Sequence, residues 1–374
     1  MLLLIGLVLL IIATFPYLIF FAGIYAGKKS TPPPMPGVFP EISIIISALN
    51  EEAVILDRIK NILESGYPKE QYEVIFVDDC STDNTRALAD QGFTDAGISY
   101  RIISNKERLG TNRSYNKAIR EARHNIIVTT DADVFFEKGA LNALIARLLS
   151  DDRIAAVCGD LRPLPKESFS TARMEGAYRS YYGRMCDWES AADATYNFNG
   201  ALVAFKKNLV NRIDDKRGAD DANTAFEAIR RGYRAVYEIG AVVYEDIPEA
   251  FFRQYRQKIR RATRLIEATI ANLDLLGHRR PFSRFFYPLR LYMYLATPLL
   301  FFVACAVIML GLFFIHPALG IAAPVLFLAV SLISRGNTFT AFAVNQMYLF
   351  AGLLNLGKDM RVWESTSNKK QKVV

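Results

Sequence analysis

Residues 126–133 read IIVTTDAD, and this stretch decides the fold. Its first three residues are apolar without polar alternation, which is typical of a strand buried on both faces of a parallel sheet. The strand runs into two acidic residues, Asp131 and Asp133, with one alanine between them. Ligands of open α/β sheets bind just beyond the carboxyl ends of the strands, so these acids are the first candidates for a functional site.

The acidic pair allows two interpretations. Two carboxylates this close repel each other unless a cation lies between them, and their spacing suits a hard divalent cation whose remaining ligands come from a diphosphate. Alternatively, they are a helix N-cap and a first-turn residue, two places where Asp is favoured. The three histidines lie far apart, and the four cysteines form no Cys-x-x-Cys. We therefore expect Mg²⁺ or Mn²⁺ rather than zinc, and no disulfide framework.

Strand and helix patterns alternate on both sides of this stretch. Further strands are expected at residues 42–47, 74–77, 102–103, 154–157 and 201–205, and helices at 51–63, 83–89, 112–122, 140–149 and 221–231. This alternation predicts an α/β fold with a mostly parallel sheet and right-handed crossovers. From residue 162 to 197 the pattern weakens into polar and aromatic residues, as in YRSYYGRMCDW, which we interpret as an extended insert near the substrate.

The N-terminal end of the chain is strongly apolar. Residues 2–26 are long enough to span a bilayer, and neither a positive n-region nor a small-residue cleavage site marks them as a removed signal. Lys28 and Lys29 follow directly, so the positive-inside rule places the next domain in the cytoplasm. Five prolines between residues 31 and 40 predict an extended spacer.

A basic amphipathic stretch follows residue 248. Its basic residues alternate with apolar ones and are Arg253, Arg256, Lys258, Arg260, Arg261 and Arg264. This pattern predicts a helix at the membrane surface, with a solvated helix on a soluble domain as the alternative. The net charge of +7 beside apolar segments favours an anionic membrane surface over nucleic acid as the partner.

The C-terminal apolar region contains two or three spans. Residues 289–315 can cross a bilayer, residues 318–333 are short and interrupted by Pro324, and residues 337–357 can cross if Asn345 and Gln346 face protein. Three spans would place the tail outside, whereas its basic residues argue for the cytoplasm: Lys358, Arg361, Lys369, Lys370 and Lys372. One segment is then re-entrant or interfacial.

These expectations divide the chain into six parts. They are an N-terminal transmembrane helix (1–27), a Pro-rich linker (28–40), an α/β domain (41–248), amphipathic interfacial helices (249–288), a C-terminal transmembrane region (289–357) and a basic tail (358–374). Neither Gly-x-Gly-x-x-Gly nor a phosphate loop occurs, so no dinucleotide fold is indicated.

The expected strands end in polar residues, which a parallel sheet brings to one crevice. Ser47, Asn50 and Glu51 follow the first strand, and Asp78 and Asp79 end the second. An acid-lined crevice rejects a bare anion but suits a nucleotide whose base and ribose donate hydrogen bonds and whose diphosphate arrives with a metal. The two aspartates also suit a turn with a capping box, and both roles can coexist.

Seven motifs in order carry a resemblance to a family. They are SALNE (47–51), VDDCSTDNT (77–85), DAD (131–133), FNGA (198–201), DD (220–221), Glu245-x-x-Pro248 and QKIRR (257–261). The set resembles the inverting family-2 glycosyltransferases with the Rossmann-like GT-A fold. The last two motifs resemble the Gln-x-x-Arg-Trp signature of the membrane-integrated branch, which includes hyaluronan, chitin and cellulose synthases.

The resemblance implies a role for each matched residue. Asp221 is expected to be the catalytic base, with Asp220 as the next candidate, and Asp131 and Asp133 are expected to hold Mg²⁺ or Mn²⁺. The expected donor-binding residues are Ser47, Asn50, Glu51, Asp78, Asp79, Arg113, Asp131, Gln257, Arg260 and Arg261. The expected acceptor-side residues are Phe198, Asn199, Gly200 and Trp188.

The implied activity is transfer of a hexosyl or N-acetylhexosaminyl group. A nucleotide sugar, UDP-linked by resemblance, would donate it at the cytoplasmic face of the cell membrane to a glycan or lipid-linked acceptor, in a multi-pass protein. Processive polysaccharide synthesis and a single transfer to polyprenyl phosphate are the alternatives within this chemistry. A non-catalytic membrane scaffold and a soluble nucleotidyltransferase are disfavoured by the complete set of acids and by the apolar segments, respectively.

Two positions depart from the family pattern. Arg261 stands where the branch has Trp, and Leu49 stands where Tyr is common. The two tryptophans, Trp188 and Trp363, do not fill the missing position. An arginine seeks phosphate or carboxylate, so we expect one or a few additions to an anionic, lipid-linked acceptor unless other aromatics stack on the sugar: Tyr181, Tyr182, Trp188 or Phe198. Arg260 and Arg261 have lipid binding as their alternative role.

Overall fold

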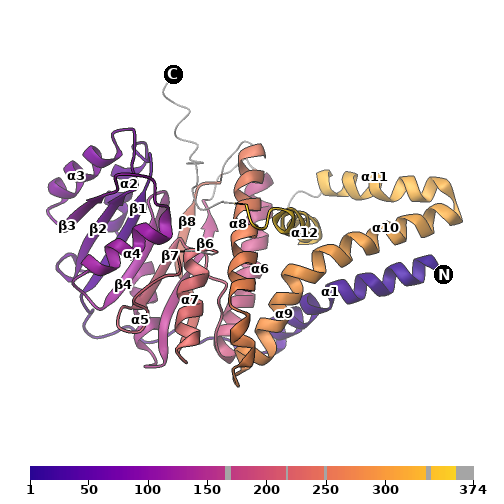
Figure 1. Ribbon diagram of the computed structural model, residues 1–374, viewed down its shortest axis with the longest axis horizontal. Coiled ribbons are helices and arrows are strands. Elements are labelled where there is room, and N and C mark those ends of the chain that lie inside the picture. The colour runs from indigo at the N-terminus through magenta and orange to yellow at the C-terminus, as the bar shows by residue number, and fades with distance from the viewer. Residues whose placement is uncertain (165–169, 216–217, 248–250, 334–337, 359–374) are drawn as a thin grey trace.

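The computed structural model describes residues 1–164, 170–215, 218–247, 251–333 and 338–358. An eight-stranded sheet in the order β3-β2-β1-β4-β7-β6-β8-β5 organises the domain that follows the linker (Figure 1). Its strands are β1 (Ile42–Ala48), β2 (Tyr72–Asp78), β3 (Ser99–Ser104), β4 (Ile126–Asp131), β5 (Val134–Phe136), β6 (Ile154–Pro163), β7 (Leu202–Lys206) and β8 (Arg234–Glu245). The quoted stretch forms β4, near the middle of the sheet.

The sheet is mixed rather than mostly parallel. β3, β2, β1 and β4 are parallel, as expected, and β6 is parallel to β8. β7 is antiparallel to β4 and β6, and β5 is antiparallel to β8. β5 and β8 were not predicted, because β5 has three residues and β8 is interrupted by exposed Ile239 and Gly240 at a shift in its pairing with β6.

Helices cover both faces of the sheet. α2 (Ile55–Leu63), α3 (Thr85–Ala96) and α5 (Ala140–Leu149) cover one face, and α4 (Thr111–Glu121) and α7 (Asp220–Arg230) cover the other. A short 3-10 helix, η1 (Lys69–Gln71), precedes β2. Ile44 and Ile46 of β1 enter one core and Ile45 enters the other. The continuous apolar strands are therefore buried on both faces, as the sequence predicted.

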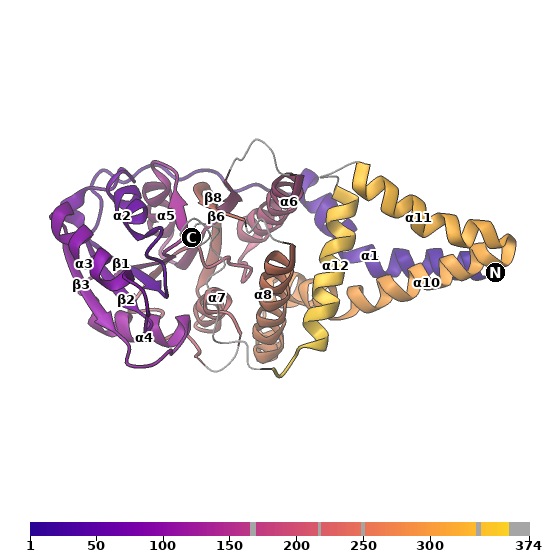
Figure 2. The same cartoon turned by 90° about the horizontal axis from the view of Figure 1, so that it is seen from above.

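Two further helices stand between the sheet and the apolar helices (Figures 1 and 2). These are α6 (Ser170–Ala192) and α8 (Phe251–Ala271). The extended insert expected over residues 162–197 is therefore wrong for most of its length. α6 is covered by β6, β8, α1 and α12. Several polar side chains of α6 therefore form buried ion pairs instead of facing solvent. A helix covered on several sides has no single apolar stripe, and its sequence hides the helical period.

The apolar helices project from this domain. Within the described residues, two of them are long and apolar enough to cross a membrane: α1 (Leu2–Ala26) and the continuous helix Phe282–Ile315. The second comprises η3 (Phe282–Phe286), α9 (Tyr287–Leu291), η4 (Tyr292–Ala296) and α10 (Thr297–Ile315), and follows η2 (Leu273–Gly277). α1 and α10 run side by side in opposite directions (Figures 1 and 2).

The last two helices are shorter. α11 (Pro317–Ile333) turns back from the end of α10, and α12 (Thr338–Leu354) lies across the others against α8 and α6 (Figure 2). Gln346 of α12 is buried and donates a hydrogen bond to Tyr17 of α1, as expected if this polar residue faces protein. The expected basic tail from Arg361 onward, Trp363 and Pro248 lie outside the described residues.

Trp188 of α6 provides the seat for α1. Its ring contacts Phe20 of α1 and Phe286 edge-on, at centroid distances of 5.5 and 5.0 Å. A Cβ atom on Gly23 would lie 2.3 Å from the indole, so only glycine allows α1 to approach this closely. The first helix is thereby fixed to α6 and to the second long helix.

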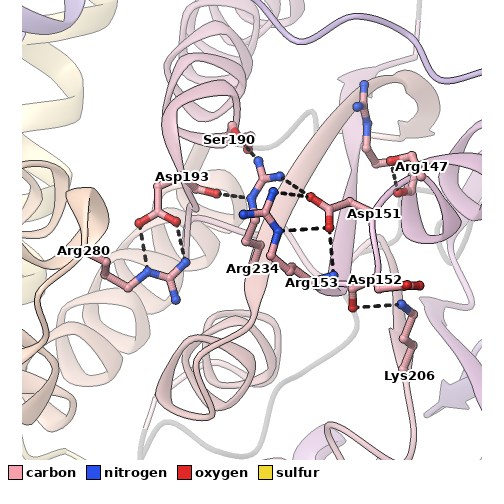
Figure 3. Close-up of polar contacts among 10 residues, drawn as sticks. Arg147, Asp151, Asp152, Arg153, Ser190, Asp193, Lys206, Arg234 and Arg280 are labelled. Atoms are coloured by element: carbon pink, nitrogen blue, oxygen red, sulfur yellow. Dashed lines mark hydrogen bonds and ion pairs between the residues drawn. The ribbon is translucent and has the colours of Figure 1, made fainter.

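A polar network joins the helices to the sheet at the edge where β6 and β8 begin (Figure 3). Arg280 donates two hydrogen bonds to the Asp193 carboxylate just after α6. Arg234, which opens β8, donates to the backbone carbonyls of Asp193 and Ser190 and to the side chain of Asp151. The candidate functional site lies at the opposite edge of the sheet, where β1, β2 and β4 end.

Glu189 of α6 and Arg290 of α9 form a fully buried ion pair, 2.6 Å apart with 1% of each side chain exposed. Removing the arginine leaves the buried Glu189 carboxylate with neither a counter-ion nor water to solvate it. Arg290→Met should therefore lower the free energy of unfolding by roughly 3–5 kcal/mol. Thermal unfolding of the full chain in detergent measures this. Arg284→Met, which removes an exposed arginine from the same helix, is the control, and equal melting temperatures for the two variants would contradict the assignment.

Candidate active site

A cavity of about 310 Å³ lies at the carboxyl ends of β4 and β8 and is bounded by α6, α7, α8 and α12. Four aspartates line it, from the turn after β4 and the start of α7: Asp131, Asp133, Asp220 and Asp221. Of the other expected residues, the cavity is lined by Phe198, Asn199, Gly200, Gln257, Arg260 and Arg261. Residues more than a hundred positions apart in the chain therefore meet in one place.

Asp131 and Asp133 flank the tight turn between β4 and β5. Burial, reinforced by the neighbouring carboxylate of Asp133, raises the pKa of Asp131 well above its ordinary value. Burial and the charge of Glu245 raise the pKa of Asp133 to about 6. In the described part of the chain, no three His, Cys, Asp or Glu side chains are grouped to hold a metal ion. A cation bound by this pair would need further ligands from a bound molecule.

Asp221 lies in the first turn of α7 beside the loop before β7. Burial, and then the charge of Asp220, raise the pKa of Asp221 to about 7. Gly200 has φ +75°, and a Cβ atom built on it would be 3.5 Å from Oδ2 of Asp221. The glycine thus allows this backbone conformation and leaves open the space in front of the carboxylate.

The basic face of α8 turns toward the cavity. Arg264 donates to Oδ1 of Asn112 at 2.9 Å and to the carbonyl of Gly218 at 2.6 Å. Burial, with Arg261 and Arg264 nearby, lowers the pKa of Arg260 to about 10. These arginines therefore contact the α/β domain, whereas the amphipathic pattern predicted a membrane-surface or solvated face. Arg264 was missed, although its spacing from Arg260 and Arg261 places all three on one side of a helix.

Five ionic side chains, most of them buried, form a cluster on the cavity wall, here called the ion cluster: Glu175, Arg179, Glu245, Lys258 and Arg261. Arg179 bridges the two carboxylates, at 2.6 Å from Glu175 and 2.7 Å from Glu245. Lys258 also pairs with Glu175, and Arg261 with Glu245. Burial alone would raise the pKa of Glu245, but Arg261 and Arg179 outweigh it and hold that pKa below its ordinary value. Sequence reasoning missed Glu175 and Arg179, whose spacing of four residues was the available signal.

The residues at the ends of β1 and β2 do not line this cavity. Ser47 pairs in register with Asp131, which places the end of β1 next to the acidic turn. Asn50 has φ +55° and accepts a hydrogen bond from the N–H of Thr82, which joins its loop to the one after β2. Glu51 is buried, and its N–H donates to the Thr85 hydroxyl.

Asp78 and Asp79 shape their own loops, which agrees with the turn interpretation. Asp78 accepts from the N–H of Ser81. Both oxygens of Asp79 accept hydrogen bonds, including those from the N–H groups of Leu109 and Gly110. Asp78 therefore holds the turn after β2, and Asp79 holds the loop that leads into α4.

Two expected site residues lie away from the cavity. Arg113 is half-exposed on α4 and pairs with Asp215 at 3.7 Å. Trp188 seats α1 and has the contacts of a packing residue, not of an acceptor platform. The aromatic side chains that do line the cavity are Tyr178, Tyr182, Phe198, Tyr237, Tyr294 and Tyr348. Tyr181 instead donates to a backbone carbonyl of α1.

Comparison with known proteins relates this arrangement to enzymes. The mannosyltransferase PcManGT from Pyrobaculum calidifontis, solved in complex with GDP-Man and Mn²⁺, matches with a TM-score of 0.79 and 26% identity, over 95% of this chain and 98% of that one. A probable glycosyltransferase, YdaM of Bacillus subtilis, is 26% identical over 229 residues, covering 59% of this chain and 54% of its own. Poly-beta-1,6-N-acetyl-D-glucosamine synthase of Staphylococcus aureus is 26% identical over 222 residues, covering 59% of this chain and 53% of its own.

The chain spans about half the length of these curated relatives. Its residues 43–207 match the model of glycosyl transferase family 2, and residues 126–353 match that of glycosyl transferase family group 2. The second match covers more than half of the chain and includes the acidic turn, α7, the ion cluster and nearly all of α12. The mixed α/β sheet, the cavity and these matches together show that the chain is a glycosyltransferase and belongs to glycosyl transferase family group 2.

Proposed function

We propose that the chain is a membrane-bound inverting glycosyltransferase that moves a sugar from a nucleoside diphosphate sugar to an acceptor hydroxyl. One observation carries this proposal: a partly buried carboxylate, Asp221, lines the same cavity as the acidic turn of Asp131 and Asp133. A base and a separate site for a charged leaving group are the two parts that a single displacement requires.

The residues present fit a divalent cation. Asp131 and Asp133 lie in a cavity wide enough for a ligand, and their negative charges are not fully compensated by nearby cations. Mg²⁺ or Mn²⁺ binds such a pair of carboxylates when substrate phosphates complete its coordination shell. PcManGT, solved with GDP-Man and Mn²⁺, supports this assignment. When bound, the cation would neutralise charge that develops on the leaving diphosphate. The motifs suggest uridine as the nucleoside of the donor, whereas PcManGT was solved with GDP-Man. A panel of UDP- and GDP-sugars distinguishes the two.

The protein's own groups carry the rest of the reaction. Asp221 accepts the proton of the acceptor hydroxyl, and its pKa of about 7 keeps a large fraction ionised near neutral pH. Arg260 and Arg264, on the face of α8 that lines the cavity, supply hydrogen-bond donors to the diphosphate. Gly200 keeps the approach to the base free of a side chain.

We further propose that α1 and the helix Phe282–Ile315 cross the cell membrane, with the catalytic domain in the cytoplasm. Both helices are long and apolar enough, and Lys28 and Lys29 follow α1 directly. α12 runs across these helices and lines the cavity, which suits an interfacial element rather than a third span.

The acceptor is proposed to be lipid-linked and to receive one or a few sugars. Arg261 is held by Glu245 in the ion cluster, so its position offers no aromatic surface for a growing neutral chain. The similarity to the S. aureus synthase favours the second candidate, a processive polysaccharide synthase. Membranes containing the protein, supplied with a panel of UDP- and GDP-sugars, should yield short products by mass spectrometry. A high-mass polymer formed without short intermediates would favour the synthase.

Asp133→Ala should abolish the Mn²⁺-dependent part of nucleoside diphosphate binding while the fold is kept. One carboxylate cannot hold the cation against water as two can. Calorimetric titration of the nucleoside diphosphate with and without Mn²⁺ measures this. Asp95→Ala, an exposed acid on α3, is the control. Wild-type affinity in Asp133→Ala would remove the metal from this site.

Asp221→Asn should keep donor affinity but slow transfer by roughly two to four orders of magnitude, the range for loss of a general base. Single-turnover transfer with saturating donor measures this. If transfer stayed near the wild-type rate, the base would lie elsewhere, with Asp220 as the next residue to test.

The pH profile provides a second measurement on the same residue. A base with a pKa of about 7 is protonated below that pH, so wild-type transfer should fall about tenfold per pH unit below 7 and level off above it. The residual rate of Asp221→Asn should lack this inflection. An inflection that persisted in the variant would assign it to another group.

A further inference from the structure

Arg179 has a hydrogen-bonding capacity that the protein itself does not use. Its Nε donates to Glu175 and its Nη2 to Glu245, so the guanidinium is held in a fixed orientation. Nη1 is buried and has no hydrogen-bond partner among the described residues. Only 10% of the whole side chain is exposed, so little water can reach it. A buried N–H group without a partner costs free energy, which a ligand acceptor would recover.

The surroundings of Arg179 favour an anion. The ion cluster contains three cations and two carboxylates, so the cluster itself carries one positive charge in excess. Asp131 and Asp133, outside the cluster, interact with its member Arg261. Each carboxylate is shared by two of the cations, which leaves no acidic group of the cluster to neutralise the excess. Guanidinium N–H groups fixed in a plane match the oxygens of a phosphate better than they match neutral acceptors.

Arg179 also lies on the wall of the cavity that faces the helical region. Its neighbours on α6, Tyr178 and Tyr182, line the same wall, as do Asn345 and Tyr348 of α12. α12 is adjacent to the helices proposed to cross the membrane, and its apolar Val344 and Leu349 line the cavity as well. An elongated ligand can thus place a polar group at Arg179 and an apolar portion along α12, with its other end toward Asp221.

We propose that Arg179 binds a phosphate group that links the acceptor sugar to its lipid. This inference rests on the proposed function and adds the chemical class of the acceptor. The phosphate serves as an anchor and not as the nucleophile, because a phosphate oxygen is already ionised near neutral pH and needs no general base such as Asp221. The proposed function gives the donor diphosphate other partners, at the acidic turn and at Arg260 and Arg264, which line the same cavity.

Binding to the full-length protein in detergent tests the assignment. The probes are farnesyl phosphate, farnesol and inorganic phosphate, each titrated with Mn²⁺ and saturating GDP or UDP present so that the donor site is filled. Wild type should bind farnesyl phosphate at least tenfold more tightly than either other probe. Arg179→Lys should lose this preference, because lysine keeps the positive charge between Glu175 and Glu245 but lacks the third nitrogen.

Two further variants make the result interpretable. Arg184→Lys changes an arginine on the same helix that contacts Tyr25 of α1 and does not line the cavity, so it should bind all probes like wild type. If Arg179→Lys does not fold, the double variant Glu175→Gln/Arg179→Gln removes the cation together with one of its carboxylates. This double variant should likewise bind farnesyl phosphate no better than farnesol.

Each contrary result overturns the proposal in a recognisable way. Equal wild-type affinities for farnesyl phosphate and farnesol would show that no phosphate is recognised. Inorganic phosphate binding as tightly as farnesyl phosphate would make the ligand a free anion. If Arg179→Lys lost affinity for the nucleoside diphosphate but kept its affinity for farnesyl phosphate, Arg179 would belong to the donor-binding site. Failure of any nucleoside diphosphate to bind wild type would instead refute the proposed function, and the farnesyl phosphate titrations remain readable without it.

Discussion

The burial of acidic side chains at one edge of the sheet is the constraint on which the rest of the structure depends. Each buried ion costs several kcal/mol unless opposite charges or hydrogen bonds compensate it. Six acidic residues line one cavity, and the sheet itself supplies no cation to it: Asp131, Asp133, Glu175, Asp220, Asp221 and Glu245. The cations come from α6 and α8, which is why the basic face of α8 turns inward and why both helices stand between the sheet and the apolar helices.

The same electrostatics divides these acids into two groups. Glu175 and Glu245 are saturated by arginine and lysine, and the pKa of each is held below its ordinary value. Burial dominates at Asp131, Asp133, Asp220 and Asp221, and the pKa of each is raised. Carboxylates whose environments push their pKa values apart have different tasks. The first group holds the walls together, and the second is free to exchange protons or bind a cation.

Much of this arrangement could be predicted from local pattern. The apolar run 126–128 predicted β4, and its two acids were expected at the strand end where they lie. The Phe198–Asn199–Gly200 loop and Asp221 were each recognised by motif, and the fold brings them to one cavity. What could not be predicted depends on neighbours distant in the chain: the direction of β7, the helical state of α6 with its several covered sides, and the capture of Arg261 by Glu245. Trp188 was expected at the acceptor because its type suits sugar stacking, but its position in space was set by α1.

The contact between Gly23 and Trp188 also has a consequence for how the protein is made. Chains leave the ribosome from the N-terminus, so α1 is synthesised long before the tryptophan and Phe286 that hold it. Until then the glycine face of α1 that packs on Trp188 has no partner on α6. The apolar helix therefore needs other apolar surroundings while the sheet folds. Closing so large a loop is entropically slow. The first segment synthesised is therefore among the last to reach its final position, and the native packing of α1 reports that residues through Phe286 are already folded.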